Sequence, residues 1–261
     1  MNFQKHYSGA DLRTISARVG RREGWDFSRM NTSHPATPWE YISVVRDLLR
    51  ATDTLIDIGT GGGERLLELS GDARQLLGVD PDPEMIGRAR ALAADKGATS
   101  VHFETGTGAE ILNQFDVVVN RHAPFEAKVV HRLLCPGGHF VTQQVGEHNM
   151  KNVRTAFQLE ANAFAPIRPE MFVQAGFIIE RFDEYDVDYV IHDMDSLVFW
   201  LQGLDLAHSD FGGFDSERDA DAINRLLSTS LTSDGVVTNE HRYLLVATKI
   251  GSSKCGATRI P

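Results

Sequence analysis

The stretch T-L-I-D-I-G-T-G-G-G-E, residues 54–64, decides the fold of this chain. Leu55, Ile56 and Ile58 form a short apolar run, four glycines follow within the next five residues, and an apolar helical pattern begins at Leu66. This order predicts a buried strand, a glycine turn and the start of a helix. Such a turn lets the backbone approach a ligand where a Cβ atom would clash, and it directs free N–H groups of the helix start at that ligand.

The spacing of these glycines separates two kinds of site. The dinucleotide-binding pattern G-x-G-x-x-G, counted from Gly59, requires a glycine at the position of Glu64. The pattern is instead D-x-G-x-G-x-G, from Asp57 to Gly63, and it resembles motif I of the class I S-adenosylmethionine (SAM)-dependent methyltransferases. A carboxylate suits the ammonium and sulfonium of SAM and would repel a pyrophosphate. A nicotinamide-dependent oxidoreductase is therefore disfavoured, and a glycine turn without a ligand is the remaining alternative.

Two further elements carry the same resemblance. Asp80 ends the predicted strand 75–80 and lies 23 residues after Asp57, where an acid can accept both ribose hydroxyls of an adenosine. The segment R-L-L-C-P-G-G-H-F, residues 132–140, resembles the family's R-x-L-x-P-G-G turn before its fifth strand. The resemblance implies a Rossmann-like α/β fold, with a seven-stranded, mostly parallel sheet, an antiparallel last strand and a helical lid. The N-R-H and T-Q-Q-V-G motifs resemble an uncharacterised bacterial subgroup.

The resemblance also implies a domain organisation. Residues 1–50 form an N-terminal helical cap segment, in which Pro38 is expected to open a helix. Residues 51–250 form the SAM-binding methyltransferase domain. A lid insertion is expected at about 193–233, because this segment is too long for a tight hairpin and long connections are usually functional. Residues 251–261 are expected to be a flexible tail.

The cofactor contacts that the resemblance implies come from the ends of the predicted strands. The loop T-G-T-G-A-E after the third strand departs from the family, because Gly108 stands where an acid often receives the adenine amino group. Recognition of adenine is then expected through the backbone of Gly108 and Ala109, or through Glu110. The full set of expected cofactor-binding residues is Asp57, Gly59, Thr60, Gly61, Gly63, Asp80, Pro81, Gly108, Ala109, Glu110 and Asn120.

The tripeptide Asn120-Arg121-His122 ends a nearly continuous apolar strand, 115–120, as expected at the centre of a parallel sheet. Ligands of open α/β sheets lie outside these strand ends. His122 is the candidate general base, since imidazole has an unperturbed pKa of about 6.5. Asn120 or Gln144 is expected to orient the acceptor. The alternative is that His122 bonds backbone or cofactor without moving a proton.

The acceptor side is expected to include Trp25, Trp39, Gln144, His148 and Trp200, with core packing as the alternative for each aromatic residue. The motif N-P-P-Y of the nucleic-acid and protein amino methylases is absent, because the chain reads N-R-H-A-P-F. The predicted function is transfer of the SAM methyl group to a nucleophilic O, N or C of a small molecule. The alternatives are an RNA methyltransferase and a SAM-binding protein without turnover.

Composition narrows the possible partners. The 261 residues carry a net charge of −10, which argues against a nucleic-acid partner. The two cysteines show no metal-binding spacing, so no metal is expected. The start of the chain lacks an apolar signal segment and no long apolar run follows, so a cytoplasmic protein without a membrane partner is expected. Monomer and homodimer both remain open.

Overall fold

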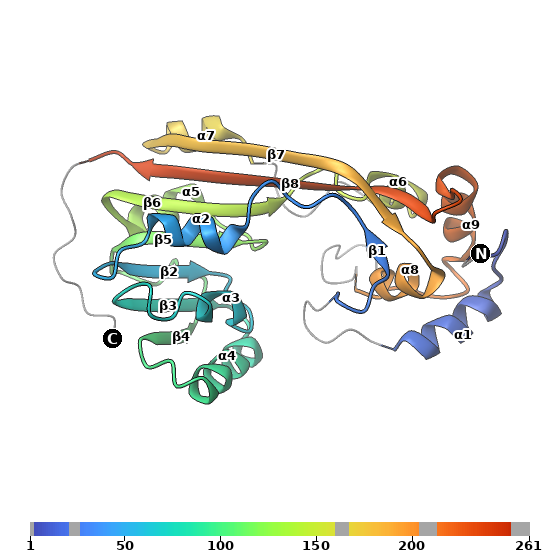
Figure 1. The fold of residues 1–261 in the computed structure, drawn as a ribbon, viewed down its shortest axis with the longest axis horizontal. Coiled ribbons are helices and arrows are strands. Elements are labelled where there is room, and N and C mark those ends of the chain that lie inside the picture. The colour runs from blue at the N-terminus through green and yellow to red at the C-terminus, as the bar shows by residue number, and fades with distance from the viewer. Residues whose placement is uncertain (1–2, 21–26, 160–166, 204–212, 252–261) are drawn as a thin grey trace. The chain divides into compact units, whose positions relative to one another are not determined.

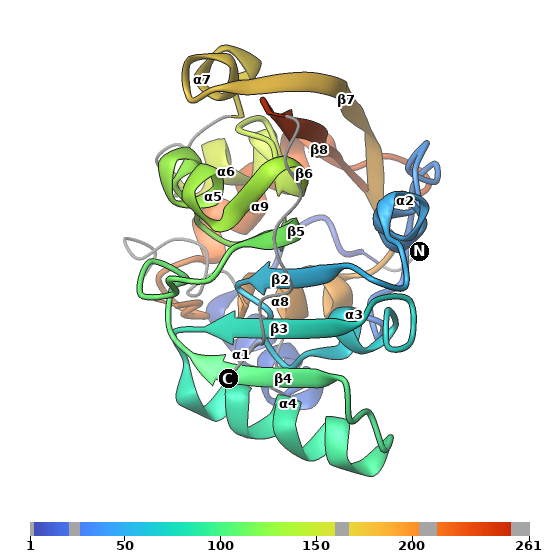
Figure 2. The same cartoon turned by 90° about the vertical axis from the view of Figure 1, so that its left-hand side faces the viewer.

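The computed structural model describes residues 3–20, 27–159, 167–203 and 213–251 (Figures 1 and 2). The chain divides into two compact units. Unit 1 comprises Met1–Ala36, Gly146–Ala165 and Tyr185–Arg242, and unit 2 comprises Thr37–Val145, Pro166–Glu184 and Tyr243–Pro261. The segment 1–50 is therefore shared between the units. Each unit has an apolar core of its own.

The strands follow the order β1-β7-β8-β6-β5-β2-β3-β4. Neighbours among β6, β5, β2, β3 and β4 pair in parallel, and Figure 1 shows β8 running opposite to β6. The predicted Rossmann-like, mostly parallel sheet is confirmed, and the short β1 adds an eighth strand against the end of β7. The strands are β1 (Thr32–Ser33), β2 (Thr54–Ile58), β3 (Gln75–Asp80), β4 (Val101–Thr105), β5 (Phe115–Arg121), β6 (Leu134–Val145), β7 (Phe177–Ile191) and β8 (Val236–Lys249).

The helices of unit 2 accompany the parallel strands. α4 packs on β3 and β4, while α2 and α5 lie on opposite faces of the sheet (Figures 1 and 2). The bounds are α2 (Tyr41–Leu48), α3 (Glu64–Leu67), α4 (Pro83–Asp95), α5 (Ala127–Leu133) and α7 (Pro169–Gln174). The prediction that Pro38 opens the helix was wrong. Glu40 caps α2, because its carboxylate accepts the N–H groups of Ile42 and Ser43 that the first turn leaves without partners.

The Pro136–Gly138 turn lies inside β6. Phe115 pairs with Leu134, but Val117 already pairs with His139, so the intervening residues bulge out of the ladder. Gly137 has a φ of 77° there, and a Cβ at Gly138 would lie 2.8 Å from the carbonyl oxygen of Asp116. The glycines therefore allow this bulge to form while β6 stays paired with β5 on both sides of it.

Unit 1 is built on short helices. α1 (Gly9–Val19) packs on α8 (Met194–Leu201), and α6 (Lys151–Ala156) packs on α9 (Ala220–Ser230). α8 and α9 are the helices described in the segment 193–233, and residues 204–212 of their connection lie outside the described ranges, as do residues 252–261. No helix in the part of the chain that the structure describes is long and apolar enough to cross a membrane.

Candidate functional site

The glycine turn after β2 combines tight packing with one open position. Gly59, Gly61 and Gly63 all have positive φ angles, of 76°, 56° and 79°. A Cβ at Gly59 would lie 2.2 Å from the Cβ of Ala123, and one at Gly63 would lie 2.7 Å from the ring of Phe103. Among the described residues, nothing lies within 4 Å of a Cβ at Gly61. Gly61 therefore presents bare backbone to open space, as a ligand-binding turn requires.

Asp80, at the end of β3, fixes this turn from the neighbouring strand. Its Oδ2 accepts a hydrogen bond from the Gly61 N–H at 2.9 Å, and its Oδ1 accepts one from the Asp82 N–H at 3.0 Å. A carboxylate offers about four acceptor positions, so each oxygen keeps one for a ligand hydroxyl. Pro81 follows and is exposed. The predicted ribose contact therefore has the acceptor capacity that it needs.

Asp57, near the end of β2, is a buried acid with 7% of its surface exposed. Its pKa is raised from 3.8 to about 6, chiefly by burial and also by the nearby charge of Asp80, against the lowering effects of the Thr60 hydroxyl and the Arg121 guanidinium. A carboxylate in this state is poised to ionise when a cation arrives. This electrostatic setting favours a positively charged ligand over a phosphate.

Asn120 is completely buried and joins three strands. Its Nδ2 donates to the carbonyl of Ile58 at 2.8 Å, and its Oδ1 accepts from Thr142 Oγ1 at 3.2 Å and from Gln144 Nε2. The carbonyl oxygen of the Asn120 side chain thus has both lone pairs in use. The structure brings the predicted Asn120 and Gln144 together, but as a cross-strand lock. Their roles toward an acceptor remain predictions.

His122 follows β5 with a φ of 57°, which is unusual for a residue other than glycine. Its backbone N–H donates to the carbonyl of Gln143 at 2.9 Å, and its ring Nε2 lies 3.0 Å from Gln143 Nε2. Gln143 Oε1 in turn accepts the indole N–H of Trp39 at 2.8 Å. Trp39, predicted as an acceptor wall, is 6% exposed and lies in the core. Gln143 lies near the end of β6, beside Gln144, in the stretch where the sequence predicts the acceptor side.

The loop expected to hold adenine is fixed by hydrogen bonds from Arg132 and within the loop itself. Arg132 donates to the carbonyls of Gly108 at 3.2 Å and Ala109 at 2.9 Å. The Glu110 carboxylate accepts from the backbone and hydroxyl of Thr107, and hydrogen bonds from its own backbone N–H and from Thr107 lower its pKa. Gly108 has a φ of 83° and is buried. Adenine recognition by this loop remains a prediction.

The other predicted acceptor residues belong to unit 1. The exposed His148 stacks on the buried His241 with ring centroids 5.3 Å apart, and its backbone N–H donates to His241 Nδ1 at 3.0 Å. Trp200 is half-buried against the core of unit 1. Trp25 lies outside the described residues. Gln144 and Trp39 belong to unit 2, so the predicted acceptor set is divided between the units.

Unit 1 also holds a buried ionic cluster that the sequence did not indicate. Arg242 Nη2 and Glu240 Oε1 lie 3.0 Å apart, with 17% and 13% of the two side chains exposed. His34 Nδ1 lies 3.1 Å from Glu240 Oε2, and the His34 ring stacks on Tyr189. Burial lowers the pKa of Arg242. Glu240 and Arg242 lie two residues apart on β8, whereas His34 and Tyr189 come from distant parts of the chain, so no local pattern predicts the whole cluster.

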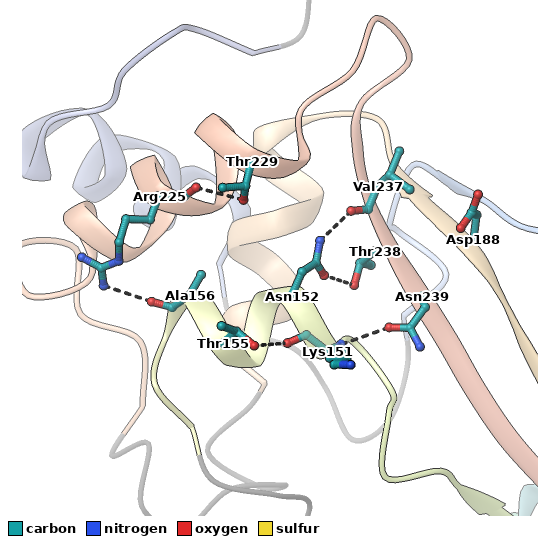
Figure 3. A pocket seen from close by; sticks show the side chains of 10 residues that line it. All are labelled: Lys151, Asn152, Thr155, Ala156, Asp188, Arg225, Thr229, Val237, Thr238 and Asn239. Atoms are coloured by element: carbon teal, nitrogen blue, oxygen red, sulfur yellow. Dashed lines mark hydrogen bonds between the residues drawn. The ribbon is translucent and has the colours of Figure 1, made fainter.

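A hollow of about 610 Å³ opens in unit 1 between α6, α9 and the start of β8 (Figure 3). Asn152 is one of the lining residues; it donates to the Val237 carbonyl at 2.7 Å and accepts from Thr238 Oγ1 at 2.5 Å. Arg225 donates to the Ala156 carbonyl at 3.0 Å. These groups serve to join α6 to β8 and α9. Within the described ranges, no cluster of three or more His, Cys, Asp or Glu residues could hold a metal ion.

A sheet of this order, with a glycine turn after β2 and an acid ending β3, defines a Rossmann-like α/β protein with a ligand site at the strand ends. The chain belongs to the methyltransferase domain family, whose match covers residues 49–186, more than half of the sequence. The resemblance found in the motifs of the sequence is thereby confirmed, and SAM is the cofactor of the class.

Known proteins add to this assignment. The uncharacterized methyltransferase YcgJ of Bacillus subtilis is 34% identical over 77 residues, so the match spans 28% of this chain and 30% of the length of YcgJ. The solved structure of YcgJ has a TM-score of 0.59 at 17% identity and covers 81% of this chain and 99% of its own.

Two further solved structures are similar. A protein of unknown function from Deinococcus radiodurans has a TM-score of 0.58 at 19% identity, covering 85% of this chain and 92% of its own. A putative methyltransferase from Bacillus halodurans has a TM-score of 0.55 at 15% identity, and the match covers 80% of this chain and 97% of that protein. At these identities the similarity shows the fold.

Proposed function

We propose that this protein transfers the sulfonium methyl group of SAM to a nucleophilic O, N or C atom of a small molecule by in-line displacement. The observation that carries the proposal is the pairing of the open turn at Gly61 with two acids, Asp57 and Asp80. SAM combines cationic groups with a ribose diol and lacks a phosphate. A buried carboxylate and a carboxylate with spare acceptor positions match these features.

The fit to SAM can be divided among residues of this chain. The absence of a side chain at Gly61 would let the cofactor pack closely against the backbone. Asp80 would accept hydrogen bonds from the ribose hydroxyls, and Asp57 would place negative charge near the cationic groups of SAM. The remaining expected contacts come from Gly59, Thr60, Gly63, Pro81, Asn120 and the loop Gly108, Ala109 and Glu110. When bound, SAM supplies an activated methyl group.

The protein's own contribution is alignment and electrostatics. Holding donor and acceptor in attack geometry can remove about 7–11 kcal/mol of the barrier. His122 would face the acceptor at the end of β5, and the buried Asn120 lock would keep that strand end in place.

A small-molecule acceptor is favoured by charge. A chain with a net charge of −10 attracts a polyanion poorly, because binding of RNA depends on the release of counterions by lysine and arginine. Asn120 is followed by arginine and histidine, where the amino methylases of nucleic acids carry two prolines.

The test begins with titration calorimetry of the whole protein against SAM, S-adenosylhomocysteine and NAD. SAM and S-adenosylhomocysteine are expected to bind, and NAD is expected not to bind. Tight binding of NAD without SAM would sink the proposal. Methyl-labelled SAM is then incubated with separate pools of small molecules and RNA. Label in the small-molecule pool supports the proposal, whereas label only in RNA, or SAM binding without transfer in any pool, contradicts it.

A further inference from the structure

We infer that Trp39 and Gln143 are positioning residues that hold the proton of neutral His122 on Nδ1, so that the ring meets an acceptor as a hydrogen-bond donor instead of a general base. The catalytic meaning of this inference rests on the proposed methyl transfer. The position of the proton does not, because it follows from three side chains of unit 2.

Trp39 sets the direction of the chain of hydrogen bonds. An indole N–H is a donor only, and it lies 2.8 Å from the side chain of Gln143. The atom that it meets must therefore be the amide oxygen Oε1. The two ends of an amide are hard to tell apart by shape alone, but a donor-only partner removes the ambiguity. A rotated amide would place its NH₂ group against the indole N–H.

Gln143 passes this direction on to His122. With Oε1 committed to Trp39, the NH₂ group of Gln143 faces the imidazole, and Nε2 of Gln143 lies 3.0 Å from Nε2 of His122. An NH₂ group donates, so Nε2 of His122 must accept with its lone pair. A neutral imidazole carries one proton, which is then on Nδ1.

The surroundings make this arrangement costly to reverse. Trp39 and Gln143 are only 6% and 7% exposed, and opposed donors in a buried position find no water to relieve them. Gln143 also bonds the backbone of His122, whose N–H donates to the Gln143 carbonyl at 2.9 Å. The φ of 57° at His122 is an uncommon conformation of the kind that clusters at functional sites.

The chemical consequence concerns the acceptor. A general base needs a free lone pair, but Nε2 of His122 uses its lone pair toward Gln143 and Nδ1 carries the proton. The acceptor must therefore react without first giving a proton to His122. This condition selects carboxylates and neutral amines. Their lone pair forms the new bond to the methyl carbon while the C–S bond breaks and its electron pair stays on sulfur. An amine product loses its extra proton to water afterwards.

Nuclear magnetic resonance of the ring nitrogens tests the inference without an acceptor. The whole protein is labelled with 15N in histidine, and the His122 signals are assigned by their loss in His122→Gln. At neutral pH the expected spectrum has a pyridine-type Nε2 and a pyrrole-type Nδ1. A protonated Nε2, in either the neutral or the cationic ring, would overturn the inference.

Two variants test the positioning residues. Trp39→Phe removes the indole donor, so the Gln143 amide can rotate and a population with the proton on Nε2 is expected. Gln143→Glu puts an acceptor opposite the ring and should move the proton to Nε2. Tyr189→Phe, which removes an aromatic hydrogen-bond donor of unit 1, is the matched control and should leave the spectrum unchanged. An unchanged ring in Trp39→Phe would remove Trp39 from the mechanism.

Titration of SAM on the same samples separates the two proposals. A pyridine-type Nε2 in a protein that does not bind SAM keeps the tautomer assignment and rejects the proposed function. SAM binding with a protonated Nε2 keeps the proposed function and rejects the inference. Should the variants fail to fold, the spectrum of the unaltered protein alone still decides the position of the proton.

Discussion

The carboxylate of Asp80 holds the backbone of Gly61 across two strands, with Oδ2 at 2.9 Å from the amide nitrogen. The contact joins the end of β3 to the turn after β2. It therefore fixes the open backbone position of the site before any ligand arrives, and it lets one acid serve both the turn and a ligand.

Replacing Asp80 by alanine should weaken SAM binding by about 10–100-fold, since a charge-assisted hydrogen bond contributes about 1.5–3 kcal/mol. Titration calorimetry measures the effect. Asp95→Ala removes an exposed acid at the end of α4 and should leave the affinity unchanged. Equal affinities for Asp80→Ala and the unaltered protein would exclude Asp80 as a cofactor contact.

Alanine substitutions in the glycine turn should separate folding from binding. Gly59→Ala drives a Cβ against Ala123 and should destabilise the protein strongly. Gly61→Ala meets no atom of the described residues and should cost only about 1–2 kcal/mol of stability, the strain of a left-handed residue, yet it should abolish SAM binding. Urea unfolding and calorimetry on both variants check this. Normal SAM affinity in Gly61→Ala would contradict close approach of the cofactor to this backbone.

The buried Asp57 predicts a pH dependence of stability. Because its pKa is raised from 3.8 to about 6 in the folded protein, the folded state holds this proton more tightly than the unfolded chain. The acid therefore lowers the free energy of unfolding progressively between about pH 4 and pH 6, by up to about 3 kcal/mol above that range.

Asp57→Asn should accordingly be more stable than the unaltered protein at pH 8 by about 2–3 kcal/mol, with the difference vanishing near pH 4. Urea unfolding without ligand, at both pH values, measures it. SAM affinity of the unaltered protein should rise as Asp57 ionises between pH 5 and pH 7, and the variant should lose this rise. A pH-independent difference in stability would show that Asp57 ionises normally.

Removing the ring of His122 should separate binding from turnover. His122→Ala should keep SAM affinity within about twofold and lower turnover by about 10–100-fold, the effect of one lost hydrogen bond to the reacting acceptor. Initial rates with the acceptor found in the pool screen measure it. His102→Ala, on β4, is the control and should keep full turnover. Unchanged turnover in His122→Ala would leave His122 without a catalytic role.

The buried pair of Glu240 and Arg242 should be essential to unit 1 as a pair. Glu240→Leu leaves the Arg242 guanidinium buried without its carboxylate and should cost about 3–5 kcal/mol. The double variant Glu240→Leu/Arg242→Met removes both charges and should lose less than the single variant. Urea unfolding of all three proteins gives the coupling. Additive losses would indicate that water solvates Arg242.

The sequence by itself determined the class of fold and the glycine turn at which the cofactor is proposed to bind. The apolar run of β2, the glycines that follow and the acid ending β3 lie in local patterns, and local patterns survive in the sequence because strand period and turn conformation constrain neighbouring residues. The turn at residues 136–138 was predictable for the same reason, although it forms a bulge within β6.

Only the tertiary structure decided what the polar side chains at the strand ends do. Asn120 lies wholly buried between β2 and β6, and Trp39, for which core packing was the alternative to a pocket wall, is buried and donates to Gln143. The cluster of Glu240 and Arg242 was not foreseen. Hydrogen bonds between distant residues depend on strand order and register. A single sequence carries no local signal for them, so the direction of the bonds that reach His122 could be read only from the fold.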